Sequence, residues 1–508
     1  MSGVAATHRE VENRALLVVS VMLATLMQAL DTTIANVALP NMQGSLSASQ
    51  DEIAWVLTSY IVAAAIATPA TGWLASVLGR RRLLLIAVAG FTVASILCGI
   101  ATTIDQMVLF RLLQGLFGAA LVPVSQSTLL DVFPREKHGA AMAMWGMGVM
   151  VGPILGPPLG GWLTDNYSWH WVFLINVPVG ALCLFGVAAS LPADDTRASR
   201  FDWRGFAFLA VGIGALQMLL DRGQLKDWFD AAEIRIEAAL TFLGFYLYAV
   251  HWLSSSRPFV DLGLFRDRNF LASNIFIFLI GIVLFATMAL LPPYLQTLMN
   301  YPVVTVGMLL APRGIGTLIA MVIVGRLLAR GADARLVAGI GMLLTALSMW
   351  QMTQWTSDVP QWDIVFAGIV QGIGVGLVFV PVSTVAYSTL PMTARTEAAG
   401  IYSLTRNIGS SVGISIMMAL LAHNTQVNHA ELAARVTPFD AVFPHLSGLS
   451  AAASLEALNG EVTRQAATIS YLDDFWLMMI LTLAAIPLLA LLRPLRHAAP
   501  ADAAMVAE

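Results

Sequence analysis

The sequence predicts an all-α integral membrane protein of fourteen transmembrane helices with both termini in the cytoplasm. Three observations lead to this fold class. Hydrophobic residues make up 58% of the 508 residues and charged residues only 11%, whereas about a quarter of the residues of soluble proteins are charged. Fourteen apolar stretches are each long enough to cross a bilayer, and Lys and Arg are concentrated in every second connection between them.

A transmembrane helix needs about 20 apolar residues. The first such stretch follows a polar N-terminus (1–14) and is longer than the roughly 7–15-residue apolar core of a signal peptide, so we interpret it as a retained helix. An even number of spans places both termini on the same side. The predicted spans are residues 15–39, 53–75, 83–101, 106–131, 139–161, 170–190, 204–220, 234–253, 269–292, 303–328, 336–355, 363–388, 397–421 and 474–492.

Basic residues indicate which side is cytoplasmic, because cytoplasmic loops retain Lys and Arg. With the N-terminus inside, the inner segments hold 19 of the 27 Lys and Arg residues, and the outer loops keep only Arg222, Lys226, Arg435 and Arg464. One missed span would invert every later loop, so this bias supports the helix count. The inner residues are Arg9, Arg14, Arg80, Arg81, Arg82, Arg135, Lys137, Arg197, Arg200, Arg204, Arg257, Arg266, Arg268, Arg326, Arg330, Arg335, Arg395, Arg493 and Arg496.

An internal repeat divides the chain into two halves. Gln114 and Gly115 in the fourth span correspond to Gln371 and Gly372 in the twelfth. This alignment places Arg111 opposite a glycine, Gly368, so a feature particular to the N-terminal half must require the arginine. The predicted organisation is a six-helix half (15–203), two inserted helices (204–253), a second six-helix half (254–492) and a cytoplasmic tail (493–508).

One outer segment, residues 422–473, is much longer than the other loops. We expect a solvated periplasmic loop with a moderately helical stretch from Ser454 to Ile469, and the alternative is a docking surface for a periplasmic partner. The segment contains three histidines that are too loosely spaced to predict a metal site: His423, His429 and His445.

Asp31 and Arg111 are the strongest candidates for a functional pair, because ionised side chains are costly within the hydrocarbon. Asp31 lies roughly 12 Å below the outer end of the first span, and Arg111 lies roughly 8 Å below the outer end of the fourth. Protonation of Asp31 would release Arg111, which would couple a proton to a conformational change. The alternative is a static ion pair between two helices.

Small residues recur at four-residue spacing in the fifth span, where they allow close helix packing. We predict a tight packing seam there, and a role as hinge and leak barrier is a separate hypothesis. The residues of this motif are Gly148, Gly152, Pro153, Gly156, Gly160 and Gly161.

The inner loop after the second span contains Gly72, Gly79, Arg80 and Arg81. These arginines anchor the topology, and they are candidates for gating contacts with carboxylates or helix ends in one conformational state.

Two further arginines, Arg313 and Arg406, lie near the middle of C-terminal spans without an acidic residue at similar depth. They either donate to carbonyls freed by neighbouring Gly and Pro residues or line a polar cavity that favours anionic groups.

These features together resemble the major facilitator superfamily, and within it the fourteen-helix drug:proton antiporters of the EmrB/QacA type. One departure concerns the loop after the second span, where this chain has Ser76 in place of the aspartate of the superfamily pattern. The segments that carry the resemblance are Leu30 to Pro40, with Asp31 and Asn36; Arg111 to Gly115, with Gln114; Gly148 to Gly161; and Trp169 to Gly180.

The resemblance implies a major facilitator fold and alternating access between the halves. It also implies proton-coupled export of amphipathic drugs or toxic compounds across the inner membrane, with Arg111 associated with proton transfer. It implies no cofactor beyond the proton gradient, and EmrB-like pumps resemble parts of assemblies with a periplasmic adaptor and an outer-membrane channel. An alternative on the same scaffold is a dedicated exporter of one metabolite, siderophore or lipid-like molecule.

Other protein classes fit the sequence less well. Proton-translocating respiratory subunits depend on intramembrane lysines, but both lysines of this chain, Lys137 and Lys226, lie outside the spans. Hydrolase and zinc-protease motifs are absent from the spans, which argues against an enzyme. A net charge of -4 gives no support for a nucleic-acid partner.

Overall fold

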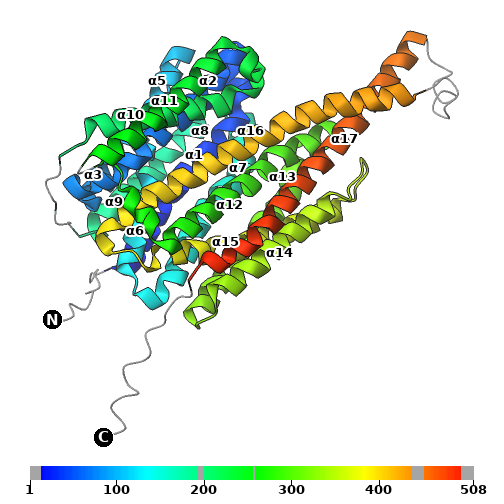
Figure 1. Cartoon of the computed structure of the whole chain (residues 1–508). Coiled ribbons are helices and arrows are strands. Elements are labelled where there is room, and N and C mark those ends of the chain that lie inside the picture. The colour runs from blue at the N-terminus through cyan, green and yellow to red at the C-terminus, as the bar shows by residue number, and fades with distance from the viewer. Residues whose placement is uncertain (1–12, 193–195, 197–199, 256–257, 437–450, 494–508) are drawn as a thin grey trace, which may run out of the picture.

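The computed structural model describes residues 13–192, 196, 200–255, 258–436 and 451–493, and these residues form a bundle of long helices without strands (Figure 1). Fourteen helical segments among them are long and apolar enough to cross a membrane, as predicted. Predicted inner residues Arg9, Arg197, Arg257 and Arg496, together with His445, lie outside the described residues.

The N-terminal half contains six spans, of which three are interrupted. The second span is broken by a short 3-10 turn at Thr68–Ala70, which contains Pro69, and the fourth span is broken before Leu121. Pro123 has no N–H to bond to the carbonyl four residues earlier, which accounts for the second break. The helices are α1 (Arg14–Ser45), α2 (Gln50–Ala67), α3 (Thr71–Leu78), α4 (Arg80–Gly99), α5 (Ile104–Gly118), α6 (Leu121–Val132), α7 (His138–Asn166), α8 (His170–Leu174) and α9 (Asn176–Ser190).

The inserted pair and the C-terminal half supply eight further spans. They are α10 (Trp203–Arg222), α11 (Ala232–Ser254), α12 (Arg268–Pro293), α13 (Val303–Ala329), α14 (Ala334–Met352), α15 (Gln361–Ser388), α16 (Arg395–Arg435) and α17 (Ala451–Ala485). Several helices begin at residues that cap the first turn. Ser49, Asp202 and Asp267 each accept a hydrogen bond from a backbone N–H of that turn.

The two halves pack their helices in the same way. In the N-terminal half α1 packs on α7, α2 on α5, and α4 on α5; in the C-terminal half α12 packs on α16, α13 on α15, and α14 on α15. The halves meet mainly where α7 packs along α13 and where α16 packs on α3 and α6. The inserted helix α10 contacts α2 of one half and α16 of the other, and the Gln217 amide donates to Ser411 Oγ at 2.7 Å.

The expectation of a loop is wrong for residues 422–435, which continue helix α16, whereas the helical stretch expected from Ser454 to Ile469 is confirmed as part of α17. Helix α16 continues to Arg435 and α17 begins at Ala451, and the two helices project together beyond the other helices (Figure 1). Asn428 donates to Ser470 Oγ at 3.0 Å between them. At 1.5 Å per residue α16 is about 60 Å long, twice the hydrocarbon thickness, so its polar outer part lies beyond the membrane.

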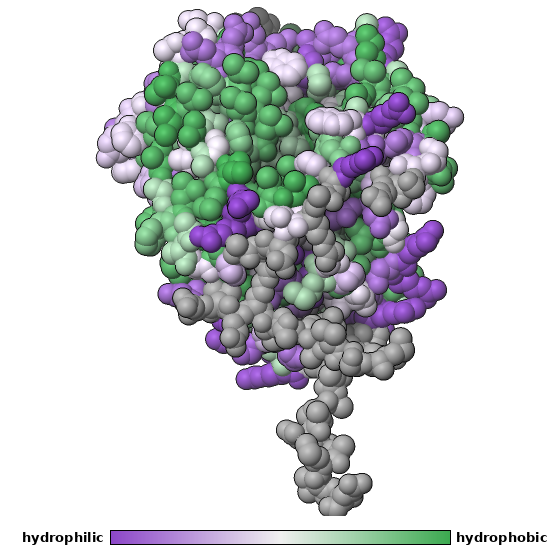
Figure 2. All heavy atoms as spheres, turned by 90° about the vertical axis from the view of Figure 1, so that its left-hand side faces the viewer, coloured by the Kyte–Doolittle hydropathy of each residue, from purple (hydrophilic) through white to green (hydrophobic). Residues whose placement is uncertain are grey.

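The outer surface matches a membrane environment. Figure 2 shows a broad hydrophobic band between hydrophilic rims on the face that it presents. Large apolar side chains are exposed on many spans, and Phe242 and Leu253 of α11 retain 74% and 77% exposure. Such exposure is costly in water and favourable against lipid, so the band marks the hydrocarbon zone.

We predict that the projecting part of α16 and α17 faces the periplasm. Ala430, exposed on the projecting part of α16, is the labelling site. Ala430→Cys should react with an impermeant thiol reagent in intact spheroplasts, because the inner loops carry the basic residues. Cys98 and Cys183 are fully buried and contribute little background. Glu136→Cys, in the loop before α7, should react only after lysis, and the reverse pattern would overturn the topology.

Candidate functional site

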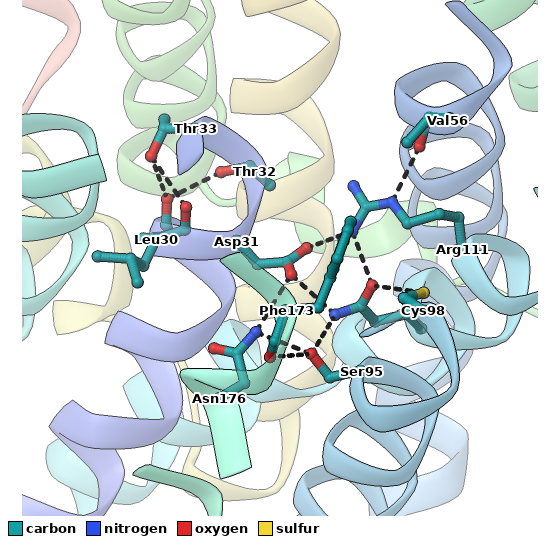
Figure 3. Close-up of polar contacts among 12 residues, drawn as sticks. Leu30, Asp31, Thr32, Thr33, Val56, Ser95, Cys98, Arg111, Phe173 and Asn176 are labelled. Carbon is teal, nitrogen blue, oxygen red and sulfur yellow. Dashed lines mark hydrogen bonds and ion pairs between the residues drawn. The ribbon is translucent and has the colours of Figure 1, made fainter. Parts of the chain in front are cut away.

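A buried ion pair joins α1 to α5 in the N-terminal half, as the depth argument predicted (Figure 3). Arg111 Nη1 lies 2.6 Å from Asp31 Oδ2, and both side chains have no solvent exposure. An isolated ion in this environment would cost several kcal/mol, whereas a hydrogen-bonded pair offsets much of that cost. The pair therefore depends on both charges being present.

Amide and hydroxyl groups complete the shell of the carboxylate. Gln114 Nε2 donates to Asp31 Oδ1 at 2.8 Å, and Asn176 Nδ2 lies 3.3 Å from the same oxygen. Both amides also donate to Ser95 Oγ, at 3.2 Å and 3.0 Å, and Ser95 donates to the Phe173 carbonyl. Side chains from α1, α4, α5 and α9 thus meet around one ionisable group (Figure 3).

The guanidinium has partners besides Asp31. Arg111 Nε donates to the Val56 carbonyl of α2 at 2.9 Å, and Nη1 also donates to Gln114 Oε1 at 2.7 Å. Its carbon lies 4.3 Å from the centre of the Tyr60 ring, a cation–π contact. Nη2 is buried and has no hydrogen-bond partner among the described residues. Arg111 would therefore keep two oxygen acceptors, but no negative charge, if Asp31 became neutral.

The C-terminal half retains the scaffold of this site without the ion pair. Gln371 Nε2 donates to Thr287 Oγ1 at 3.2 Å, so Thr287 takes the place that Asp31 has beside Gln114. Gly115 packs on the backbone of Tyr60, and Gly372 packs on the backbone of Arg313.

Tyr60 and Arg313 thus hold equivalent positions in the two halves. In the N-terminal half Arg111 lies on the fourth span and the Tyr60 ring on the second. In the C-terminal half Arg313 lies on the span equivalent to the second and faces Gly368. The C-terminal half therefore has no arginine at the position of Arg111, and it has one, Arg313, at the position equivalent to Tyr60.

Sequence reasoning did not assign functional roles to the polar neighbours Ser95, Asn176 and Tyr60. Asn176 belongs to the Trp169 to Gly180 segment that carries the family resemblance, so the sequence did indicate a role for it. For Ser95 the only indication was a polar residue within an apolar span. Asn36 was a candidate site residue; it is exposed on α1 and forms no hydrogen bond with the described residues around Asp31.

Helix α7 packs between α1 of its own half and α13 of the other half. On one side Gly152 and Gly156 meet Ala29 and Thr33 so closely that a Cβ has no room, and Gly160 meets Ile34 in the same way. Gly148 and Gly161 have only ordinary contacts, and Pro153 is half-buried. The tight seam is thus formed by three of the five glycines in the motif.

The opposite face of α7 forms part of the contact between halves. Ile154 packs against Gly314 of α13, and nearer the inner end Leu328 of α13 packs against Gly139. Gly152 and Ile154 are two positions apart on α7, so this helix contacts α1 on one side and α13 on the other within the same turn. This gives a continuous line of contacts from the neighbours of Asp31 to the other half.

A set of ion pairs connects the halves where α6 meets the start of α16; we name it the inner latch, because the basic residues predict that this end is cytoplasmic. Asp131, at the end of α6, is 5% exposed and forms ion pairs with Arg80 of its own half and with Arg395 of α16, the latter at 2.8 Å. Arg395 also donates to the Leu130 carbonyl at 3.1 Å, and Arg80 Nε donates to Thr396 Oγ1 at 3.0 Å. Arg80 therefore makes the kind of carboxylate contact that the gating hypothesis required.

The other residues of the inner loop have different positions. Gly72 packs against Glu397 of α16, where a Cβ would lie 2.9 Å from its Cα, so this glycine belongs to the contact between halves. Gly79 joins α3 to α4 with φ 79°, a backbone conformation that favours glycine. Arg81 donates to the Ala188 carbonyl at 2.7 Å and stays within its own half.

Arg313 and Arg406 are both buried, with 9% and 7% exposure, and neither forms an ion pair in the described part of the chain. Arg313 Nη2 donates to the Leu284 carbonyl of α12 at 3.3 Å, which is not one of the carbonyls beside the Gly and Pro residues of its own helix. Arg406 Nη2 lies 3.4 Å from Asn407 Oδ1, and its Nε has no partner. The residues described here include no cluster of His, Cys, Asp and Glu that could hold a metal ion.

Comparisons with known proteins agree on one family. Residues 21–414 match the model of the Major Facilitator Superfamily. The fatty acid resistance protein FarB of Neisseria gonorrhoeae is 37% identical and covers 94% of this chain and 96% of its own length. The multidrug export protein EmrB of Escherichia coli K12 is 35% identical, covering 91% and 92%.

More distant relatives extend the comparison. The colistin resistance protein EmrB of Acinetobacter baumannii is 31% identical and covers 82% of each chain. The crystal structure of the human organic anion transporter MFSD10 (TETRAN) matches with a TM-score of 0.59 at 15% identity, covering 92% of this chain and 99% of that one. This last likeness concerns the fold alone.

The packing of α7 on α1 gives a testable prediction. Gly156→Ala should lower transport severalfold at matched membrane abundance, because the added Cβ meets Thr33 and overpacking of this kind costs about 1–3 kcal/mol. Gly161→Ala is the matched control on the same helix, since its Cβ would lie 3.9 Å from Val37, an ordinary contact. Reconstituted dye efflux measures both. Equal rates for the two variants would show that the seam has no part in transport.

Proposed function

The chain belongs to the Major Facilitator Superfamily, and we propose that it exports amphipathic drugs and toxic compounds across the cell inner membrane in exchange for protons. The observation that carries this proposal is the fully buried Asp31–Arg111 pair, which exists in one half of a repeated scaffold and is replaced by Thr287 in the other. Packing alone does not require such a pair, since the C-terminal half folds without it.

The proton step takes place on the Asp31 carboxylate. A proton that enters from the outside binds an Asp31 oxygen and neutralises the ion pair. Arg111 then holds an uncompensated charge against the Val56 carbonyl and Gln114 Oε1, an arrangement that is costly in a buried site. Helices α1, α2, α4, α5 and α9 must rearrange to lower that cost. Release of the proton to the inside restores the pair.

The contacts of α7 support a route from this step to alternating access. Ala29 and Thr33 lie two residues before and after Asp31 and meet Gly152 and Gly156 of α7. The other face of α7 packs on α13 of the C-terminal half. A shift of α1 would therefore reach the surface between the halves through one intervening helix, α7. We propose that this shift loosens the inner latch at Asp131 in the half-cycle that opens the pump to the cytoplasm.

The proposal requires no cofactor, because the proton gradient supplies the driving force and Asp31 is the titrating group. The family is one of transporters, in keeping with a protein that moves a small molecule through a lipid membrane without altering it. The names of the multidrug relatives support export of drugs, and that these drugs are amphipathic is part of our proposal.

A dedicated exporter of one lipid-like molecule is a second candidate function. The observation in its favour is the 37% identity to a protein named for fatty acid resistance. A susceptibility and efflux screen over unrelated cationic, neutral and anionic compounds separates the two. Export of several classes supports the multidrug function, and export of a single class supports the dedicated one.

A periplasmic adaptor, leading to an outer-membrane channel, is the partner that we propose for the projecting part of α16 and α17. The supporting observation is the length of these two helices. Two paired helices extend beyond the hydrocarbon zone, although crossing the membrane requires no such length. The exposed side chains of Val427 and Leu455 on these helices offer apolar contacts to a partner.

We predict that Asp31→Asn abolishes proton-driven export while the protein still folds and inserts. Asparagine keeps the size and much of the hydrogen bonding of aspartate but cannot release a proton, so it imitates the protonated state permanently. In proteoliposomes with an imposed pH gradient, lipophilic dye export by this variant should fall to the rate of protein-free vesicles.

The control for this prediction is Asp51→Asn, which removes an exposed carboxylate of the same outer region and should export normally. Arg111→Lys should also be impaired, since lysine retains the charge and loses the planar fork that contacts Asp31, Gln114 and Val56. Uphill export by Asp31→Asn near the wild-type rate would make Asp31 a structural partner and place the coupling group elsewhere.

A further inference from the structure

The inserted helix α10 lies against the side of α2 that faces away from Arg111. Helix α2 presents the Val56 carbonyl and the Tyr60 ring to the guanidinium. Thr58 lies between these two residues, and at 3.6 residues per turn its side chain points roughly 200° away from that of Tyr60. Thr58 is buried, and its hydroxyl donates to the carboxylate of Asp221 on α10. Helix α2 is therefore packed between α5 on one side and α10 on the other.

Asp221 is an exposed carboxylate that binds a buried hydroxyl. It lies one residue beyond the predicted seventh span (204–220), at the outer end of α10. None of the ion pairs between described residues includes it, so the Thr58 hydroxyl is the contact that ties this carboxylate to α2. The charged residues nearby have partners of their own: Arg222 pairs with Glu233 and Glu237 of α11, and Lys226 pairs with Asp51 of α2.

Helix α10 is also attached to the C-terminal half. Gln217, one turn before Asp221, is 3% exposed and donates to Ser411 Oγ of α16 at 2.7 Å. Further along α10, Gly214 lies so close to Ile66 of α2 that an added Cβ would be 3.0 Å from the Ile66 side chain. Helix α10 therefore holds α2 from a position that is itself fixed to the other half.

The position of α2 matters most when Asp31 is neutral. Arg111 then keeps the Val56 carbonyl, Gln114 Oε1 and the Tyr60 ring, and two of these three contacts come from α2. The nearest other titratable groups, Tyr60 of α2 and Cys98 of α4, are of types that are uncharged at neutral pH. A displacement of α2 away from Arg111 would weaken two of the three contacts and raise the free energy of the protonated state.

We propose that Asp221 is a positioning residue for the proton step. Through Thr58 it holds α2 so that the Val56 carbonyl and the Tyr60 ring stay on Arg111 while Asp31 carries a proton. The Gln217–Ser411 hydrogen bond gives α10 a fixed point on α16 from which to do so. This assignment rests on the proposed export function, and it gives the inserted helix a part in proton coupling.

The test measures dye export by proteoliposomes at a fixed pH gradient over a series of outer pH values. Export requires proton uptake, so it falls as the outer pH rises. We expect Thr58→Val and Asp221→Leu to lose export at an outer pH about half a unit to one unit lower than the wild type, because a lost hydrogen bond lowers the proton affinity by about threefold to tenfold. The double variant should shift no further than either single variant, since both act through one contact.

Conservative variants and matched controls accompany these two. Thr58→Ser keeps the hydroxyl and Asp221→Asn keeps an acceptor oxygen, so each should shift the pH midpoint less than the variant that removes the group. Thr241→Val removes a hydroxyl that donates to the Glu237 carbonyl of its own helix, and Asp230→Leu removes another exposed carboxylate of the outer region. Both controls should keep the wild-type midpoint.

The remaining outcomes separate positioning from other roles. An unchanged midpoint in Thr58→Val and Asp221→Leu overturns the proposal even if the maximal rate falls, because lost packing lowers the rate without moving the midpoint. Loss of export in Asp221→Asn beside a normal profile in Thr58→Val makes Asp221 a proton carrier and overturns it as well. If one of the two variants does not insert, the other carries the test.

Failure of the proposed function would give a different result. Wild-type protein that exports no dye at any outer pH overturns proton-coupled export itself. Wild-type export with unchanged midpoints in the variants overturns the assignment of Asp221 alone.

Discussion

The Asp31 carboxylate and the Arg111 guanidinium lie 2.6 Å apart without solvent contact. The folded N-terminal half therefore requires both charges to be present together. Neither group tolerates the loss of the other at this depth, because an unpaired buried ion costs several kcal/mol. The carboxylate and the guanidinium are therefore held by Gln114 of α5 itself and by Asn176 and the Val56 carbonyl, which come from two further helices, α9 and α2. Any process that changes the charge of Asp31 acts on all of these helices together.

The two halves show what this constraint adds to a common scaffold. Both use a glutamine on the fourth equivalent span and a glycine that lets the second equivalent span approach it. The C-terminal half places threonine where the other has aspartate, and its arginine moves to a position where a main-chain carbonyl satisfies it. One half thus keeps an ionisable pair in its interior, whereas the buried arginines of the other, Arg313 and Arg406, form no ion pair with a described residue.

The number of spans and the Asp31–Arg111 pair could be predicted because hydropathy counts helices and the rise per residue gives depth. Hydropathy predicts which residues lie in lipid, not which are helical. It therefore ends the thirteenth span at residue 421, although the more polar residues that follow, which include four alanines, continue α16 to Arg435. Asp131 was missed because it lies at the end of a predicted span, where a charge needs no explanation. The repeat held a signal for it, since Asp131 aligns with Ser388 in the same register that places Arg111 opposite Gly368. The shell of Ser95 and Asn176 follows from the crossing of α4 and α9, which a single sequence does not reveal.

Proton exchange at Asp31 is the central claim, and substrate-induced proton release measures it most directly. Purified protein in weakly buffered solution with a pH indicator receives a lipophilic dye that the wild type exports. The account predicts that dye binding releases protons from the wild type and from Asp51→Asn, and none from Asp31→Asn. Proton release from Asp31→Asn equal to that of the wild type would contradict the account.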